Sequence, residues 1–260
     1  MRGIFLIFII SFVNISLAIA DTFPGEQSVG FYSAGSLVNS EITPAAGKGY
    51  VVLYPAREKN FSSKELRTLV EGSTNEMADR FPGLDRIQLG DFSANSGGFL
   101  AGHASHQNGL DADLSYFRVD HREQIPGTGD GFDESFVVDG KITPNFDSRR
   151  NWELIQFMVS SGIVTRIFVD PMIKHTLCQW AGTDQNQSIT ETLRVLRPYS
   201  NHRAHMHVRI ACPKESPRCT AQVPPPPGDG CGEVETNSFG IIPSLAERLF
   251  LKIVGTEIPE

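Results

Sequence analysis

Five of the seven histidines lie in two short segments of this 260-residue chain, residues 102–113 and 201–208. At the second segment, residues 204–210 alternate between polar and apolar types, which predicts a β-strand with one face in the core. His205 and His207 therefore share the polar face of that strand. Two imidazoles on one face can converge on one point, either as two metal ligands or as a ligand and a base.

The first segment adds a third imidazole and a carboxylate. Asn108-Gly109 is a tight-turn signal, which predicts that His106 lies before the turn and Asp113 on the strand after it. Across that turn Asp113 can approach His106. With His207 they form a set of two imidazoles and one carboxylate, which fills three positions of a tetrahedral zinc and leaves the fourth for water. Catalytic zinc sites have this open arrangement, whereas structural zinc sites are closed.

Each motif alone has a simpler interpretation. A histidine pair on a strand is commonly a surface or hydrogen-bonded polar pair, and Asn-Gly followed by Asp is commonly only a turn. Their co-occurrence with two further histidines, His103 and His202, favours a metal site. We expect these two histidines to support the ligands or to contact the substrate, with a buried polar role as the alternative.

The elements that must position these side chains alternate irregularly between strand and helix. This order favours an α+β fold with a mainly antiparallel sheet and flanking helices. The local patterns predict, in chain order, a strand at 49–54, a helix capped by Ser62 and Glu65 that runs to Phe81, a helix at 152–159 ended by Gly162, a strand at 163–169 and a helix from Pro171 to Trp180.

Composition and motifs exclude several functions. The formal net charge is −7, so the chain offers no basic field for nucleic acid or for an anionic membrane surface. The sequence has no G-x-S-x-G elbow, no P-loop lysine and no H-E-x-x-H helix. Serine hydrolase, nucleotide hydrolase and zincin mechanisms are therefore not expected.

The first twenty residues predict export. Arg2 precedes an apolar run at 4–12, and Ala18-Ile19-Ala20 has the small-x-small pattern of a cleavage site. An uncleaved membrane anchor is the alternative, but the apolar stretch falls short of the ~20 residues needed to span a bilayer. We expect a signal peptide at 1–20, a catalytic domain at 21–215 and a proline-rich tail at 216–260. The exported protein would then have no membrane segment.

Export places the four cysteines in an oxidising compartment, where disulfides are the default. Four cysteines allow three pairings. Cys212 and Cys219 are seven residues apart, so a local bridge is the simplest pairing and leaves Cys178 with Cys231. A cysteine zinc site is the alternative, but the sequence contains no C-x-x-C pair.

These residues resemble the penicillin-insensitive murein endopeptidases, zinc peptidases of bacterial cell-wall metabolism. The pattern S-H-x-x-G-x-D-x-D paired with H-x-H is the signature of the wider lysostaphin, D-Ala-D-Ala carboxypeptidase and hedgehog-like fold. The resemblance extends over roughly residues 24–232. Besides the histidine segments, it is carried by Arg166-Ile167-Phe168-Val169 with Pro171, Arg197-Pro198, Cys212-Pro213 and Pro227-Gly228-Asp229-Gly230-Cys231-Gly232.

The resemblance implies a periplasmic enzyme that hydrolyses the D-alanyl to diaminopimelyl cross-link of peptidoglycan. It implies Zn²⁺ held by His106, Asp113 and His207, with His205 as the base. A D,D-carboxypeptidase of the same fold is one alternative, since Arg203 and Arg209 could bind a terminal carboxylate. A non-catalytic zinc-holding module that binds murein or a partner is another, and it would have no need of an unliganded base.

Two departures from the family pattern affect these expectations. Where members can carry an extra cysteine early in the chain, this sequence has Ser36, which leaves the docking of the tail open. Where some members place a histidine that helps to hold a second metal near His103, this sequence has Ile142, so a second site is expected to be weak. The oligomeric state, including a homodimer, stays open at this point.

Overall fold

The computed structural model describes residues 25–182 and 186–232. The expected signal peptide and residues 233–260 of the expected tail lie outside the described residues. The elements, in chain order, are β1 (Gln27–Phe31), β2 (Ala34–Val38), β3 (Glu41–Ile42), β4 (Tyr50–Val52), the 3-10 helix η1 (Pro55–Arg57), β5 (Phe61–Ser62), α1 (Lys64–Arg80), β6 (Ile87–Leu89), β7 (Asp111–Ser115), β8 (Val137–Val138), β9 (Lys141–Ile142), α2 (Ser148–Ser160), β10 (Val164–Val169), α3 (Pro171–Ala181), α4 (Gln187–Val195), β11 (Leu196–Pro198) and β12 (His205–Ile210).

A six-stranded sheet in the order β11-β10-β12-β7-β6-β4 forms the centre of the fold. Its three inner pairings, β10 with β12, β12 with β7 and β7 with β6, are antiparallel. Both edge strands pair in parallel, β11 with β10 and β4 with β6. The α+β class is therefore confirmed, but the sheet is mixed where a mainly antiparallel one was predicted, because a helical connection lies between the two strands of each edge pair, α1 between β4 and β6, and α3 and α4 between β10 and β11.

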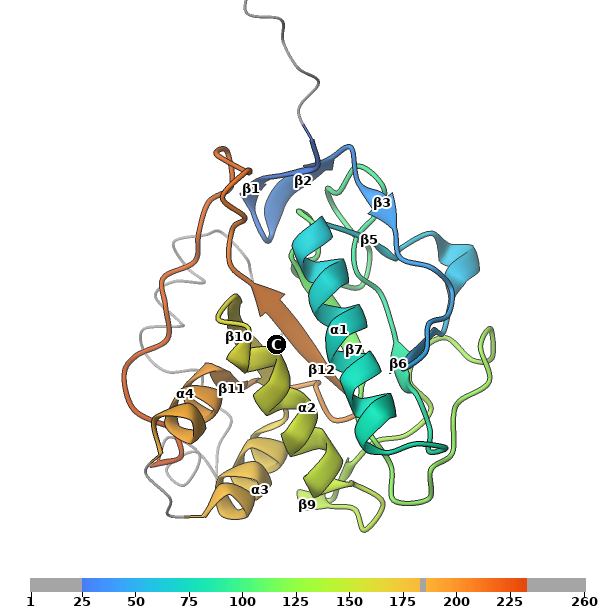
Figure 1. Ribbon diagram of the computed structural model, residues 1–260, viewed down its shortest axis with the longest axis vertical. Helices are drawn as coiled ribbons and strands as arrows, with labels where there is room; N and C mark the ends of the chain where they lie inside the picture. The colour runs from blue at the N-terminus through green and yellow to red at the C-terminus, as the bar shows by residue number, and fades with distance from the viewer. Residues whose placement is uncertain (1–24, 183–185, 233–260) are drawn as a thin grey trace, which may run out of the picture.

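Helices α1 and α2 lie side by side across one face of this sheet, and α2 also packs on α3 and α4 (Figure 1). The amphipathic pattern predicted for 62–81 is observed in α1, which buries Leu66, Leu69, Val70 and Met77. The capping prediction was wrong by one residue. Ser62 belongs to β5, and the side chain of Ser63 accepts the hydrogen bond from the backbone N–H of Leu66, three residues into the helix.

The alternation along β7 and β12 separates the core from the site. Ala112, Leu114, Met206 and Val208 are fully buried toward the helices. The intervening side chains point to the other face, where the register sets His207 opposite Asp113. The antiparallel pair β7 and β12 thus presents apolar core residues on one face and the candidate site residues on the other.

The described part of the C-terminal segment is bound to the domain. Both expected disulfides are present, Cys178–Cys231 and Cys212–Cys219. Gly30 of β1 forms a backbone β-bridge with Cys219, and the Arg166 side chain donates a hydrogen bond to the backbone carbonyl of Val223. Residues 216–232 therefore lie along the core, whereas a boundary at 215 remains a prediction.

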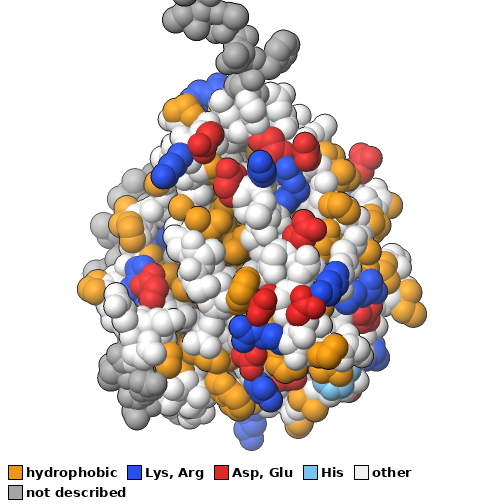
Figure 2. Space-filling model, viewed as in Figure 1, with side chains coloured by type: hydrophobic (Ala, Val, Ile, Leu, Met, Phe, Trp, Pro, Cys, Tyr) orange, Lys and Arg blue, Asp and Glu red, His pale blue; other side chains and the backbone are white. Residues whose placement is uncertain are grey.

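The surface and the helices give two further observations. On the face shown in Figure 2, positive and negative side chains are interspersed, without a broad area of one sign. Among the described residues, no helix is long and apolar enough to cross a membrane.

A fully buried lysine ties three elements together. Lys174 of α3 donates from its ammonium group to the carbonyl oxygen of Leu193 in α4 at 2.6 Å and to that of Asp229 at 2.7 Å. Burial of an ammonium group is tolerated only with such partners. Lys174 therefore links α3 to α4 and to the C-terminal segment.

We expect Lys174→Met to lower the free energy of unfolding by about 2–3 kcal/mol, because two carbonyl groups lose a charged donor while the apolar stem is kept. Urea unfolding followed by circular dichroism measures the change. Lys48→Met is the matched control, since Lys48 is an exposed lysine that pairs with Asp79; it should cost less than about 1 kcal/mol. Equal losses in the two variants would contradict the role of Lys174.

Candidate metal centre

The carboxylate of Asp113 is the point on which the predicted site residues converge. From its Oδ1 atom, Nε2 of His106 is 3.4 Å away, Nδ1 of His207 is 3.5 Å away and Nε2 of His205 is 3.7 Å away. On the other oxygen, Oδ2, Nδ1 of His103 lies at 3.7 Å. The structure therefore brings together all of the residues predicted as ligands or base.

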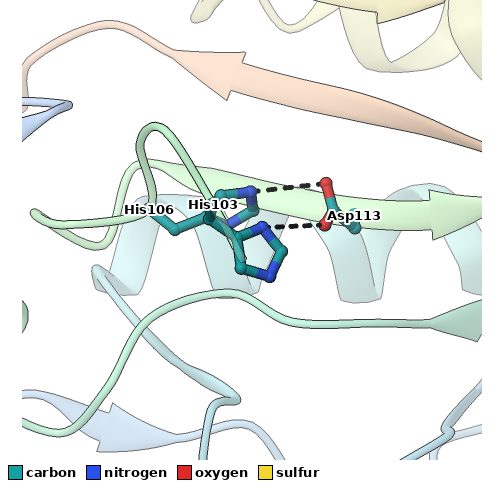
Figure 3. Close-up of side chains that lie close together, drawn as sticks. All are labelled: His103, His106 and Asp113. Carbon is teal, nitrogen blue, oxygen red and sulfur yellow. Dashed lines mark ion pairs between the residues drawn. The ribbon is translucent and has the colours of Figure 1, made fainter. Parts of the chain in front are cut away.

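His103, His106 and Asp113 form the tightest group. Each offers one donor atom, and these atoms all lie within 4.8 Å of one another, with the two imidazoles reaching from one loop toward the β7 carboxylate (Figure 3). His103 thus lies closer to the centre than the supporting role predicted for it required. Its Nε2 atom is 3.1 Å from Oδ2 of Asp91, which follows β6 and orients the ring.

His106 reaches Asp113 from a loop that precedes β7. The segment before Asn108 is not a strand, and β7 pairs with β12 and β6. In this loop His106 has a φ of 67°, and its backbone N–H donates to Oδ2 of Asp111 at 3.0 Å. As predicted, His106 precedes Asn108-Gly109, Asp113 lies on the strand that follows, and their side chains are in contact. A left-handed backbone held by a buried carboxylate places the imidazole.

Hydrogen bonds fix which ring nitrogen of His106 and of His207 faces Asp113. Nδ1 of His106 donates to the carbonyl oxygen of Phe92 at 2.6 Å, so its Nε2 atom carries the lone pair. Nε2 of His207 donates a hydrogen bond to Oδ1 of Asp111 at 2.9 Å, so the unprotonated Nδ1 atom faces Asp113. Metal-ligating histidines are oriented in this way by a carbonyl or a carboxylate on the far nitrogen.

Arg209 lies behind the site. It is buried, it donates to both oxygens of Asp111 at 2.7 and 3.2 Å, and its guanidinium carbon lies 4.2 Å from the centroid of the Tyr32 ring. The alternative that Arg209 binds a substrate carboxylate is therefore wrong. Its charge compensates Asp111, which in turn orients His207. Arg203 remains exposed, with its Nε atom 3.5 Å from Asp170.

The donor set fits a metal ion. Nε2 of His106 and Oδ1 of Asp113 are both buried and have no hydrogen-bond partner among the described residues. Two facing acceptor atoms in a buried place are costly unless a cation or a proton lies between them. Imidazole nitrogens with one carboxylate oxygen form the ligand set that suits zinc.

Electrostatics keep this set ready to bind a cation. Burial alone would raise the pKa of Asp113, but the imidazoles of His106 and His205 outweigh it, and the pKa lies far below its ordinary value. Burial lowers the pKa of His207 to about 4 and lowers the pKa of His202 and of His205. Burial opposes protonation of His106 as well, yet the nearby Asp113 carboxylate raises the pKa of that imidazole. At neutral pH the carboxylate is ionised and His207 is an unprotonated donor.

His205 is held between two rings. It stacks on Phe132 with ring centroids 5.0 Å apart and an interplanar angle of 17°, and His202 lies on it at 5.1 Å. His202 is itself fixed, because its Nδ1 donates to the carbonyl oxygen of Ser200 at 2.9 Å. Within the described residues the imidazole of His205 makes no hydrogen bond, so ring packing orients it.

The position of Phe132 is set by its neighbours. The carboxylate of the next residue, Asp133, is bound by Arg118 and Arg122. A Cβ at Gly90 would lie 2.8 Å from the Phe132 ring, so a side chain there would displace the ring from its present position. Phe132, Asp91 and the role of Asp111 were not predicted from the sequence. Two of them carried a signal, because Asp111 stands in the histidine motif and Asp91 lies just after a short buried strand, whereas Phe132 carried none.

Two comparisons place the chain in a family. Fold and site define an α+β protein with a buried cluster of histidines and a carboxylate able to hold a divalent cation. The family model described as penicillin-insensitive murein endopeptidase matches residues 28–242. The chain belongs to this family.

Individual relatives carry the same name. The penicillin-insensitive murein endopeptidase of Klebsiella pneumoniae is 37% identical over 216 residues, which cover 79% of this chain and 74% of that protein. The one of Escherichia coli is 35% identical over 222 residues, covering 80% and 75%, and that of Salmonella typhi is 35% identical over 218 residues, covering 79% and 74%.

We expect Phe132→Ala to make His205 several-fold more reactive toward diethyl pyrocarbonate in the metal-free protein, because the ring that covers one face of the imidazole is removed. Peptide mapping by mass spectrometry measures modification at His205 alone. Ile125→Ala is the control, since Ile125 lies on the same loop and is 71% exposed. If His205 reacts at the wild-type rate in Phe132→Ala, the stacked ring does not shield it.

Proposed function

We propose that this protein is a zinc-dependent murein endopeptidase that hydrolyses the D-alanyl to diaminopimelyl cross-link of peptidoglycan, and that it acts in the periplasm after cleavage behind Ala20. The observation that carries the proposal is the convergence of three imidazoles on Oδ1 of Asp113, with the buried Nε2 of His106 lacking a hydrogen-bond partner in the described part of the chain. Membership of the family supports the substrate, since the relatives are named for cleaving murein.

His106, Asp113 and His207 would hold the metal through Nε2, Oδ1 and Nδ1. When bound in such a site, Zn²⁺ polarises a carbonyl group and lowers the pKa of a water molecule toward ~7. The chain supplies the orientation of these donors: Phe92 fixes the ring of His106, and Asp111 fixes that of His207. His103 is a further donor within reach, so its contribution to metal affinity is part of the test below.

His205 would accept the proton of the attacking water and deliver it to the leaving amine. Burial lowers the pKa of His205, so the ring is unprotonated and able to accept a proton at neutral pH. Its Nε2 atom lies 3.7 Å from Oδ1 of Asp113, beside the donor set. His202 packs on the ring of His205 and would keep it in place.

The position of His205 favours an enzyme over a binding module. An unprotonated imidazole next to the ligands serves no purpose in a protein that only holds zinc, whereas a hydrolase needs a base there. A D,D-carboxypeptidase would share this centre. We also propose that the sheet and site correspond to the lysostaphin and hedgehog-like core whose histidine motifs the sequence carries.

The proposal is tested by digesting purified peptidoglycan with the exported protein, with and without a chelator, and identifying the products by mass spectrometry. Release of uncross-linked muropeptides that stops with chelator is the expected result. Loss of terminal D-alanine with cross-links intact would identify a carboxypeptidase instead, and binding without any product would indicate a binding module.

We expect metal ligands and base to separate by substitution. His106→Ala, Asp113→Ala and His207→Ala each remove a donor, so zinc content after dialysis and activity should both fall sharply. His205→Ala should keep near-stoichiometric zinc while cross-link cleavage drops by roughly 10²- to 10⁴-fold. His103→Ala should keep zinc and lose activity only modestly.

Zinc content and activity are measured on the same preparations, after circular dichroism has shown each variant to be folded. Loss of zinc in His205→Ala would make His205 a ligand, and full activity in that variant would remove it from the mechanism. Loss of zinc in His103→Ala would make His103 a ligand, as the tight group in Figure 3 allows.

We expect zinc affinity to fall by about one decade per pH unit on acidification below pH 6.5, because one ligand must lose a proton to bind. That ligand is His106, whose pKa lies above the ordinary value of 6.5. His207, with a pKa of about 4, and Asp113, with a lowered pKa, stay unprotonated between pH 8 and 5. Competition with a chromogenic chelator measures the slope. A slope of two decades per unit near pH 5 would show that His207 titrates there as well.

A further inference from the structure

Two cations lie at the edge of the metal centre and have no part in the chemistry proposed above. Nζ of Lys59 is 3.3 Å from Oδ2 of Asp91, and a terminal nitrogen of Arg57 is 3.9 Å from Oδ1 of the same carboxylate. Asp91 in turn contacts His103 at 3.1 Å. The cationic pair Arg57 and Lys59 is thus separated from the donor set by a single carboxylate.

The charges in this cluster do not cancel. Asp91 carries one negative charge against the two positive charges of Arg57 and Lys59, which leaves one positive charge on these three residues together. The contact with Arg57, at 3.9 Å, is also too long for a hydrogen bond. The guanidinium group of Arg57 therefore keeps N–H donors that a ligand can use.

Arg57 is held in one orientation. Its guanidinium carbon lies 3.7 Å from the centroid of the Tyr54 ring, and one terminal nitrogen donates to the carbonyl oxygen of Asp130 at 3.0 Å. The hydroxyl group of Tyr54 bonds the same loop, at the carbonyl oxygens of Thr128 and Gly131. A guanidinium stacked on a ring and fixed at one corner loses little freedom on binding a carboxylate.

A hollow of about 330 Å³ lies beside this guanidinium. Its walls come from Tyr54 and Pro55 on one side and from Pro126 and Gly127 on the other, with Arg57 as the charged group. A mainly apolar hollow with one fixed charge is the usual form of a subsite for an amphipathic ligand. Arg57 connects the hollow to the metal centre, because it lines the hollow and also contacts Asp91, the partner of His103.

We propose that Arg57, supported by Lys59, binds the free carboxylate that diaminopimelate carries next to the scissile amide, and that the hollow takes the adjoining part of the peptide. This inference rests on the proposed function. The carboxylate is bonded to the carbon that bears the scissile nitrogen, so the group that binds it must lie beside the metal centre. Arg57 and Lys59 lie beside it, because both contact Asp91 and Asp91 contacts His103.

Arg203 is the competing cation. Its side chain is 58% exposed and its ion pair with Asp170 balances its charge, so it is neither fixed nor in excess. Arg57 is stacked and tethered and belongs to a cluster with a net positive charge. The structure therefore favours Arg57, and the test below includes both.

The test compares two substrates: a purified cross-linked muropeptide dimer with free diaminopimelate carboxylates, and the same dimer with these carboxylates amidated. Wild type should favour the free form. Arg57→Gln should raise KM for the free form by about 10- to 100-fold, the usual contribution of a hydrogen bond to a charged group, with kcat nearly unchanged. KM for the amidated form should not change. Arg57→Lys should restore part of the preference.

A second measurement is independent of turnover. Calorimetric titration of the metal-free protein with the free dimer should show the same loss of affinity in Arg57→Gln, while zinc content and melting temperature match those of wild type. Arg149→Gln, at an exposed arginine of α2, is the control and should leave both substrates unaffected.

The outcomes are distinguishable. If wild type cleaves neither dimer, the proposed function fails. If wild type cleaves both dimers equally well, or if Arg203→Gln and not Arg57→Gln abolishes the preference for the free form, the function stands and the assignment to Arg57 is overturned.

Discussion

The pairing of β7 with β12 is the constraint on which the rest of the structure depends. Its antiparallel register sets Arg209 opposite Asp111 and His207 opposite Asp113, so each buried carboxylate meets its partner across the strands. A shift of one residue would turn these charges into the core and the core leucines out of it. The helices on one face and the loops on the other are both built against this pair.

Two neighbouring carboxylates with different partners divide the work of the centre. Asp111 is fully buried and its pKa lies well below the ordinary value, because Arg209 and His207 outweigh the effect of burial. It accepts bonds from Arg209, His207 and the backbone of His106. Asp113, two residues on, keeps an oxygen without a hydrogen-bond partner in the described structure. The scaffold thus satisfies one acid completely so that the other can remain available.

The sequence was sufficient for features that depend on local periodicity. Alternation along 204–210 identified the strand and the side of His205 and His207, and amphipathic spacing identified α1. It was not sufficient for the loop of His106, because a left-handed backbone at a histidine has no local signal. Phe132 and the burial of Arg209 also escaped prediction, since long-range packing places both. The residue types in the histidine motifs identified the site, whereas the residues that hold those side chains in place could not be identified from the sequence.

The contact between the two ends of the described chain has a consequence for how the protein can be made. Ser28 bonds Ser216 across 188 residues of sequence, and the Tyr32 hydroxyl bonds the carbonyl oxygen of Ile210 across 178. The two partners of each contact are synthesised far apart in time, and contacts between residues so distant in sequence form slowly. A growing chain that has not yet reached residue 205 lacks β12, and with it His205 and His207. The candidate metal centre therefore cannot assemble until β12 has been synthesised and has paired with β7.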